Sequence, residues 1–272
     1  MIYKMIALDV DGTLLNDDHK LTDQTKYAVR RADEAGIYIV LCTGRGPMNA
    51  IPIMEELGLE GVMITHNGAV TIYSEDSRVV DLCSFNKKEI APFLQYCRQH
   101  RVQFDLCAPS QLYGEYVTDA GSAMYLKFGV QTLQVENVLD LEVSMVKLSV
   151  FADSSHMDQM EVVFRQMDSP LSIIRSGDHF MDIMHPEATK GNALKRLAEE
   201  LGIERSQIMA IGNYFNDLEM IEYAGLGIAM ENSPDSLKKL ADTTTASNND
   251  DGVHKAIMLH CFGEQHCIRS ED

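Results

Sequence analysis

Two acidic side chains stand close together near the beginning of the chain. Asp9 and Asp11 are separated by one residue in the segment LDVDGTLL, which continues a short apolar run. If a buried strand ends between them, both carboxylates converge at its carboxyl tip, where Gly12 allows the turn and Thr13 adds a hydroxyl. Carboxyl groups this close tend to separate in pKa, so that one can stay ionised while the other carries a proton. An Asp-rich turn without chemistry is the alternative for this pattern alone.

Two further strand ends carry groups that suit an anion. The apolar run IYIVLC ends in Thr43, Gly44 and Arg45, and the run VMIT ends before His66 with Asn67 and Gly68 behind it. Hydroxyls and backbone amides at strand-to-helix turns can hold phosphoryl oxygens. An ordinary strand end is the alternative at the first place, and a hairpin turn is the alternative for the Asn-Gly pair at the second.

A lysine opens a strongly amphipathic helix pattern in the second half of the chain. Lys190 precedes GNALKRLAEEL, whose apolar spacing is helical, and Gly202 marks the helix end. A cation at a helix start is unfavourable for the helix dipole. Such a placement indicates a task elsewhere than in the helix; a solvated lysine is the alternative.

These segments, together with a later one, resemble the motifs of the haloacid dehalogenase superfamily and, within it, the Cof-type phosphatases, which carry an inserted cap. The matching motifs are DVDGT from Asp9, TGR from Thr43, HNGA from His66, the KG pair at Lys190, and GNYFNDLEMIEYAGLGIAM from Gly212. They are spread over both ends of the chain.

The resemblance implies a covalent mechanism. Asp9 would attack a phosphoryl group to form an aspartyl phosphate, and Asp11 would protonate the leaving ester oxygen and then deprotonate the hydrolytic water. Lys190 would complete the catalytic set by pairing with Asp9 and the phosphate. The residues expected to bind the phosphate or the substrate are Gly12, Thr43, Gly44, Arg45, Asn67, Gly68 and Asn216.

The resemblance also implies a magnesium cofactor, at a site where this chain departs from the family. The family pattern GDxxND has an aspartate that ligates the metal, and Asn213 stands in its place. Mg²⁺ prefers hard oxygen ligands, and a neutral amide oxygen supplies less charge than a carboxylate. The expected metal site consists of Asp9, the backbone carbonyl of Asp11, Asn213 and Asp217, the last as a direct ligand or as an anchor behind the ligands.

The order of the predicted elements gives the fold class. From residue 1 to 82 strands and helices alternate, ending in a hairpin over Val70 to Leu82, and the alternation resumes after residue 185. This order predicts a doubly wound parallel sheet with right-handed crossovers. Between residues 83 and 184 helices separate strands of alternating polarity. We therefore predict an α/β fold: a Rossmann-like core of residues 1–82 and 185–272 and an inserted α/β cap of residues 83–184, with hinges near Leu82 and His185.

Charge and composition limit the partners. Against 41 acidic residues the chain has 23 basic ones, a formal net charge of -18. Nucleic acids and anionic membranes need a basic surface, so neither is expected as a partner. An anionic phosphate would have to be attracted locally, by Mg²⁺, Lys190, Arg45 and helix N-termini.

Six cysteines without a CxxC pair, no leader-like start and no run long enough to span a bilayer lead us to expect a reduced, cytoplasmic protein. Near the C-terminus His260, Cys261, His266 and Cys267 could bind a soft metal, although a surface tail is the simpler interpretation.

The sequence thus predicts a Mg²⁺-dependent phosphohydrolase of small phosphorylated metabolites, such as sugar phosphates, with the cap closing over the substrate. Two alternatives stay open. One is a phosphate-binding or sensor protein of the same fold, weakened as a catalyst by Asn213. The other is a phosphomutase, in which the phosphoryl group passes to a second hydroxyl. The sequence specifies neither the individual substrate nor the oligomeric state.

Overall fold

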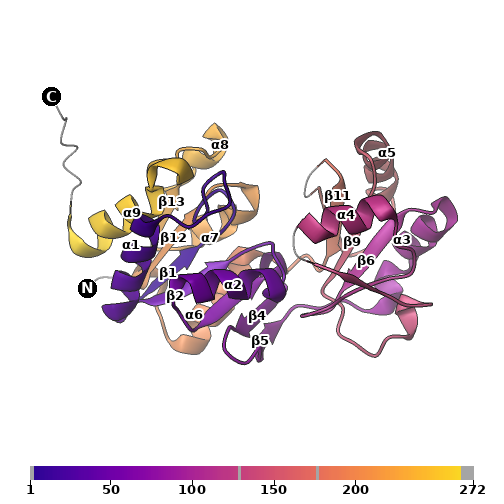
Figure 1. Cartoon of the computed structure of the whole chain (residues 1–272), viewed down its shortest axis with the longest axis horizontal. Helices are drawn as coiled ribbons and strands as arrows, with labels where there is room; N and C mark the ends of the chain where they lie inside the picture. The colour runs from indigo at the N-terminus through magenta and orange to yellow at the C-terminus, as the bar shows by residue number, and fades with distance from the viewer. Residues whose placement is uncertain (1–2, 128–129, 176–177, 265–272) are drawn as a thin grey trace.

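Two β-sheets form separate halves of the molecule in a computed structural model that describes residues 3–127, 130–175 and 178–264 (Figure 1). The strands of the first sheet, in spatial order, are β14 (Thr243–Thr244), β13 (Leu226–Ala229), β12 (Ile208–Gly212), β1 (Met5–Leu8), β2 (Tyr38–Cys42), β3 (Val62–Thr65), β4 (Val70–Tyr73) and β5 (Val79–Leu82). Those of the second are β10 (Ser172–Arg175), β11 (Phe180–Met184), β9 (Lys147–Phe151), β6 (Gln103–Cys107), β7 (Leu112–Gly114) and β8 (Thr132–Gln134).

Several helices begin or end at signals that the sequence carries. Thr22 caps α1 by accepting a hydrogen bond from the backbone N–H of Thr25, Pro47 opens α2, and Gly202 ends α6 in the left-handed conformation. The helices are α1 (Asp23–Glu34), α2 (Pro47–Leu57), α3 (Lys87–His100), α4 (Asp119–Lys127), α5 (Ser154–Phe164), α6 (Lys190–Leu201), α7 (Leu218–Tyr223), α8 (Asp235–Lys238) and α9 (Gly252–Phe262).

The first sheet is doubly wound, which confirms the predicted fold class. From β14 to β3 all neighbouring strands are parallel, and the β4–β5 hairpin adds two antiparallel strands at one edge. Along β1, Ile6 and Leu8 pack in the cluster that includes α1, α2 and α9, whereas Met5 and Ala7 pack in the cluster that includes α6 and α7. Alternate residues of one buried strand therefore fill two cores, and each large side chain stabilises the fold by about 1.5–3 kcal/mol.

The second sheet differs in its two faces. Its apolar face packs against α3 and α5, where Phe93 and Phe164 meet edge to face. The opposite face carries a buried polar row of Asp105, Ser149 and Asp182 on three neighbouring strands. All six strands lie between residues 103 and 184, within the segment 83–184, which we call the inserted unit. Its boundaries as a domain remain a prediction.

Two further properties of the described residues concern membrane-spanning helices and the state of the cysteines. Within the described ranges, no helix has the length and apolar character needed to cross a membrane. The cysteines that the structure describes, Cys42, Cys83, Cys97, Cys107 and Cys261, are all free thiols. The proposed soft-metal group at the C-terminus includes His266 and Cys267, which lie outside the described residues.

Candidate active site

Four strand ends meet at one edge of the first sheet. Asp9 follows β1, Thr43 follows β2, His66 follows β3 and Asn213 follows β12. Strand order reverses at β1, which lies between β2 and β12, and this switch point is where open α/β sheets leave a crevice for ligands. The candidate site is therefore assembled by the topology of the sheet from residues far apart in the sequence.

A buried lysine lies between two buried carboxylates at the centre of this edge. Lys190 Nζ donates to Asp9 Oδ1 at 2.6 Å and to Asp217 Oδ1 at 2.5 Å, and all three side chains are at most 7% exposed. When both carboxylates are ionised, the group carries one net negative charge out of water. Burial and the charge of Asp217 raise the pKa of Asp9 to about 7, although Lys190 opposes the shift. Burial alone would lower the pKa of Lys190, but the two carboxylates outweigh it and raise that pKa, so the ammonium stays charged.

Asp217 uses both of its carboxylate oxygens within the protein. Its Oδ2 accepts hydrogen bonds from the backbone N–H groups of Asn213 at 2.8 Å and Tyr214 at 3.0 Å, and its Oδ1 accepts from Lys190. The side chain also packs against Gly212, where a Cβ would lie only 2.6 Å from it. Of the two roles expected for Asp217, the anchor that holds the loop and Lys190 suits this arrangement better than the direct metal ligand.

Asp11 lies at the open side of the site and is held by an arginine. Arg45 Nε and Nη2 donate to the two carboxylate oxygens of Asp11 at 2.8 and 2.5 Å, a two-point geometry that fixes the orientation of the carboxylate. Thr43 Oγ1 accepts from the backbone N–H of Arg45 at 3.1 Å, so its own O–H can donate to a ligand. Arg45, expected at the phosphate, thus pairs with the expected acid in this structure.

The Asn-Gly pair is both a hairpin turn and a part of the site. The short 3₁₀ turn η1 (His66–Gly68) joins the antiparallel strands β3 and β4, and Asn67 Oδ1 accepts a hydrogen bond from Asn216 Nδ2 at 3.1 Å. Gly44 faces Asn67 so closely that a Cβ there would lie 2.9 Å from Asn67 Oδ1. The two interpretations of the Asn67–Gly68 pair, a hairpin turn and a part of the candidate site, therefore apply to the same turn.

The residues expected at the metal site fit a hard cation. As placed, the side-chain oxygen of Asn213 faces the carbonyl oxygen of Asp11 and Oδ2 of Asp9, with no hydrogen atom between these acceptors; turning the amide would give 3.1 Å hydrogen bonds to both. Only in the first orientation do three oxygens converge, which is the donor set that Mg²⁺ prefers, and there the Thr13 hydroxyl also donates to the Asn213 oxygen at 3.3 Å. Within the described part of the chain no three His, Cys, Asp or Glu side chains cluster around a metal position, so a metal here would need the Asp11 carbonyl oxygen and the Asn213 amide oxygen in addition to the Asp9 carboxylate.

One residue of the site was missed by the sequence analysis. Asn232 Nδ2 donates to the carbonyl oxygen of Gly12 at 2.9 Å, and Asn232 Oδ1 accepts from the backbone N–H of Asn248 at 3.2 Å. Asn232 thereby ties the turn behind Asp11 to a loop more than 200 residues later. The available signal was its position just after the apolar strand LGIA, at the same edge of the sheet as the other site residues.

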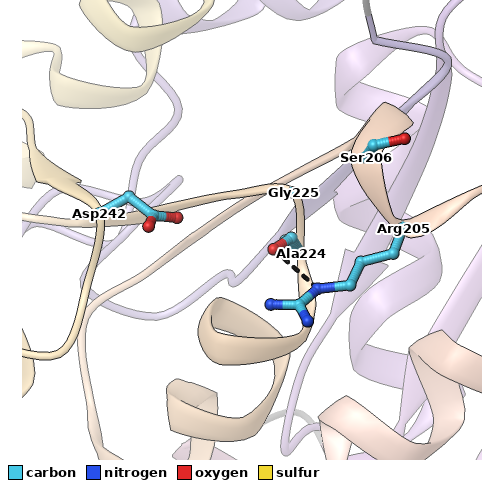
Figure 2. A pocket seen from close by; sticks show the side chains of 5 residues that line it. All are labelled: Arg205, Ser206, Ala224, Gly225 and Asp242. Atoms are coloured by element: carbon cyan, nitrogen blue, oxygen red, sulfur yellow. Dashed lines mark hydrogen bonds between the residues drawn. The ribbon is translucent and has the colours of Figure 1, made fainter.

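A surface pocket of about 280 Å³ lies elsewhere on the first sheet (Figure 2). Ser206, Gly225 and Asp242, which line it, precede β12, β13 and β14, so the pocket lies at the opposite strand ends from Asp9. Figure 2 shows that the side chain of Arg205 turns back to the carbonyl oxygen of Ala224. None of the expected site residues lines this pocket.

Comparison with known proteins places the chain in a family. The model of the haloacid dehalogenase-like hydrolases matches residues 6–257, and the chain belongs to this family. YxeH of Bacillus subtilis (strain 168) is 32% identical over 263 residues, covering 94% of this chain and 97% of the relative. A second protein of that strain, the 5-amino-6-(5-phospho-D-ribitylamino)uracil phosphatase YcsE, is 31% identical over 255 residues, covering 93% and 94%.

The fold agrees with this assignment. A crystal structure of a haloacid dehalogenase-like hydrolase from Bacteroides thetaiotaomicron superposes with a TM-score of 0.83 at 28% identity and covers 94% of this chain and 98% of that one. Family membership and the phosphatases among its relatives define the chain as a phosphatase of the haloacid dehalogenase superfamily.

Proposed function

We propose that the protein is a Mg²⁺-dependent phosphohydrolase of small phosphorylated metabolites that works through an aspartyl phosphate. The observation that carries the proposal is Lys190, buried between Asp9 and Asp217 with Asp11 at the open side. A structural ion pair would not need a second carboxylate in the same dry space, because a third buried charge is unfavourable. A nucleophile that must meet an anionic phosphate does need a fixed cation beside it.

Each step uses a group that the geometry supplies. An Asp9 oxygen attacks phosphorus, the bond from phosphorus to the ester oxygen breaks, and Asp11 gives its proton to the leaving alcohol. Water then attacks the acyl phosphate, Asp11 takes the proton of that water, and inorganic phosphate leaves Asp9 restored. Lys190 orients Asp9, while Thr43 and the turns after β2 and β3 hold phosphoryl oxygens. Mg²⁺, held by Asp9, the Asp11 carbonyl and Asn213, would neutralise phosphoryl charge.

The inserted unit is the proposed cap, with hinges near Leu82 and His185. A relative as similar as YcsE is named for a phosphorylated polyol derivative, which supports a small metabolite as the substrate class. A cap that excludes water and contacts the leaving alcohol would select among such esters. Free thiols in all described cysteines support a reducing, cytoplasmic location.

The test is a panel of phosphorylated metabolites assayed for inorganic phosphate with and without Mg²⁺, in the wild type and in Asp9→Asn. We expect Mg²⁺-dependent phosphate release by the wild type and none above a few per cent of that rate in the variant, whose fold should persist. Release of phosphate also separates hydrolysis from transfer to a second hydroxyl. Activity retained in Asp9→Asn would refute the covalent mechanism.

Asn213 favours one other candidate, a phosphate-binding or sensor protein with weakened metal binding. The neutral amide leaves the oxygen set one charge short of a site with an aspartate. A metal titration with p-nitrophenyl phosphate distinguishes the two: turnover that saturates with Mg²⁺ supports the enzyme, whereas phosphate binding without turnover at any Mg²⁺ concentration supports the sensor.

A further inference from the structure

Three successive residues of the turn after β3 have left-handed backbone angles. The φ values are 49° at His66, 55° at Asn67 and 100° at Gly68. Only the last is a glycine, and its place is dictated by contact: a Cβ on Gly68 would lie 2.1 Å from the carbonyl oxygen of Thr189. Strain at two non-glycine residues persists only where the surroundings fix the backbone, and such sites are often functional.

This turn is attached to several parts of the candidate site. The backbone N–H of His66 donates to the carbonyl of Arg45 at 2.9 Å, and that of Asn67 donates to the carbonyl of Thr43 at 3.0 Å. Asn67 also accepts the bond from Asn216. A shift of the turn would therefore move the loop that carries Thr43 and Arg45, and with Arg45 the carboxylate of Asp11.

The His66 side chain connects the same turn to the inserted unit. His66 is 6% exposed, its ring lies against Gly46, and Nε2 is 3.3 Å from the carbonyl oxygen of Pro109 in the loop between β6 and β7. Because a carbonyl can only accept, Nε2 must carry the proton. Nδ1 is then a buried acceptor, and it has no partner among the described residues.

A buried nitrogen without a partner is unfavourable, so apolar packing alone would favour a hydrocarbon side chain at this position. The hydrogen bond to Pro109 is the interaction that the imidazole makes and that a hydrocarbon side chain at this position could not make. Burial and the ammonium of Lys147 lower the pKa of His66 to about 3, which keeps the ring neutral.

We propose that His66 is a positioning residue that couples the seating of the inserted unit to the catalytic loop. Contact with Pro109 fixes the ring, the ring fixes the strained turn, and the turn fixes Thr43, Arg45 and Asn67. The kinetic part of this proposal rests on the proposed phosphohydrolase function; the structural coupling does not.

Two substitutions separate the bond from the packing. His66→Gln places an amide N–H near the position of Nε2, whereas His66→Leu fills the space and cannot donate. His254→Leu is the matched control, since His254 is also buried and its Nδ1 lies 3.0 Å from the carbonyl oxygen of Gln24, between α9 and α1. Pro109→Gly loosens the acceptor and leaves His66 intact.

The first measurement needs no turnover. Amide hydrogen exchange of the segment from Cys107 to Leu112 is followed in the full-length proteins with and without inorganic phosphate. We expect phosphate to slow this exchange in the wild type, His66→Gln and His254→Leu, but not in His66→Leu or Pro109→Gly. Equal protection in His66→Leu and the wild type overturns the coupling, and so does an equal loss in His254→Leu.

The second measurement is kinetic, with p-nitrophenyl phosphate and glucose 6-phosphate. In His66→Leu we expect kcat to fall roughly tenfold to a hundredfold, because small misplacements of catalytic groups have effects of this size. His66→Gln should recover most of the rate, and adding Pro109→Gly to His66→Leu should bring no further loss. If His66 were only structural, His66→Leu and His66→Gln would lose equal amounts of kcat. That result would overturn the proposal. If the wild type hydrolyses neither ester, the proposed function fails and the exchange data still decide the coupling.

Discussion

Asp9 lies where its own negative charge is unfavourable. Its carboxylate shares a dry space with Asp217, and one lysine compensates only one of the two charges. Fixed charges of this kind suit a group that has to bind a phosphate and a metal, since each ligand changes the local balance. The free energy of unfolding of the metal-free protein should show how much this arrangement destabilises the fold.

We predict that Asp9→Asn stabilises the metal-free protein, and more so at pH 8 than at pH 5. The folded pKa of Asp9, about 7, is above the unfolded value of 3.8, so the stability that this group contributes at low pH is lost as the pH rises through 7. At pH 8 the difference from Asn should reach about 1–4 kcal/mol, or roughly 2–4 °C in Tm per kcal/mol. Thermal melts at both pH values test this; an equal gain at both contradicts it.

Asp11→Asn should affect alkyl phosphates more than aryl phosphates. The proposed acid protonates the leaving oxygen, and this help is worth about a hundredfold to ten-thousandfold for a poor leaving group and less for an acidic phenol. The Asn side chain keeps one acceptor for Arg45, so the loop should stay in place. The check is kcat/KM for glucose 6-phosphate and p-nitrophenyl phosphate in both proteins, where equal losses on the two esters would argue against an acid.

Asn213→Asp should bind Mg²⁺ about tenfold to a hundredfold more tightly, because a charge-assisted contact is worth about 1.5–3 kcal/mol. Calorimetric titration of Mg²⁺ gives the affinity directly. Asn216→Asp is the matched control: it makes the same change of charge three residues away, at a side chain that hydrogen-bonds Asn67. Equal affinities in the wild type and Asn213→Asp would place residue 213 outside the metal site.

At the scale of elements, the sequence predicted the strands and helices that carry the site. The run VMIT is β3, the helix that begins with Lys190 is α6, and the Gly202 signal ends it. Apolar periodicity and end signals are local properties, so they can be read without the fold. The doubly wound parallel sheet was predicted as well, since parallel strands with right-handed crossovers leave few arrangements, but the order of its strands was not predicted.

The features that could not be predicted are contacts between residues far apart in the sequence and very short strands. The pairing of Arg45 with Asp11 joins two loops, and the bond from Asn232 to Gly12 joins residues 220 positions apart. The short strand β7 pairs with β8 in parallel across an intervening helix, and three-residue strands have no distinct pattern. These features are set by tertiary contacts, which a local pattern does not encode.

The turn after β3 packs closely against the start of α6, and comparing alanine substitutions at two glycines tests how much this contact matters for stability. Gly36 and Gly68 both have positive φ, but a Cβ on Gly36 would meet nothing within 4 Å, whereas one on Gly68 would meet the backbone of Thr189 and Lys190. Gly36→Ala should cost about 1–2 kcal/mol for its backbone conformation alone. Gly68→Ala should cost that plus about 1–3 kcal/mol for overpacking.

Denaturant unfolding measures both costs, and the activity assay adds a second readout. Only Gly68→Ala should reduce turnover, because the displaced backbone leads directly into Lys190. If the two variants lose equal stability, the close approach of Gly68 to the start of α6 has no energetic consequence.

At the scale of the whole molecule, the two units meet at a buried histidine whose pKa is lowered. His66 reaches from the first sheet to Pro109, and the ammonium of Lys147 on β9 contributes to the low pKa of His66. Protonation of His66 would place a second buried cation near Lys147. The contact between the units should therefore weaken in acid.

The wild type should lose stability between pH 7.5 and pH 5.5 that His66→Gln retains. The folded pKa of His66, about 3, is below the unfolded value of 6.5, so in this range the unfolded chain binds the proton and the folded chain does not. Stability therefore falls as the pH drops through 6.5, by about 1 kcal/mol over this interval. Other titrating groups are common to both proteins and cancel in the comparison. Urea unfolding at the two pH values gives the free energies, and parallel changes in the two proteins would show that His66 does not carry this pH dependence.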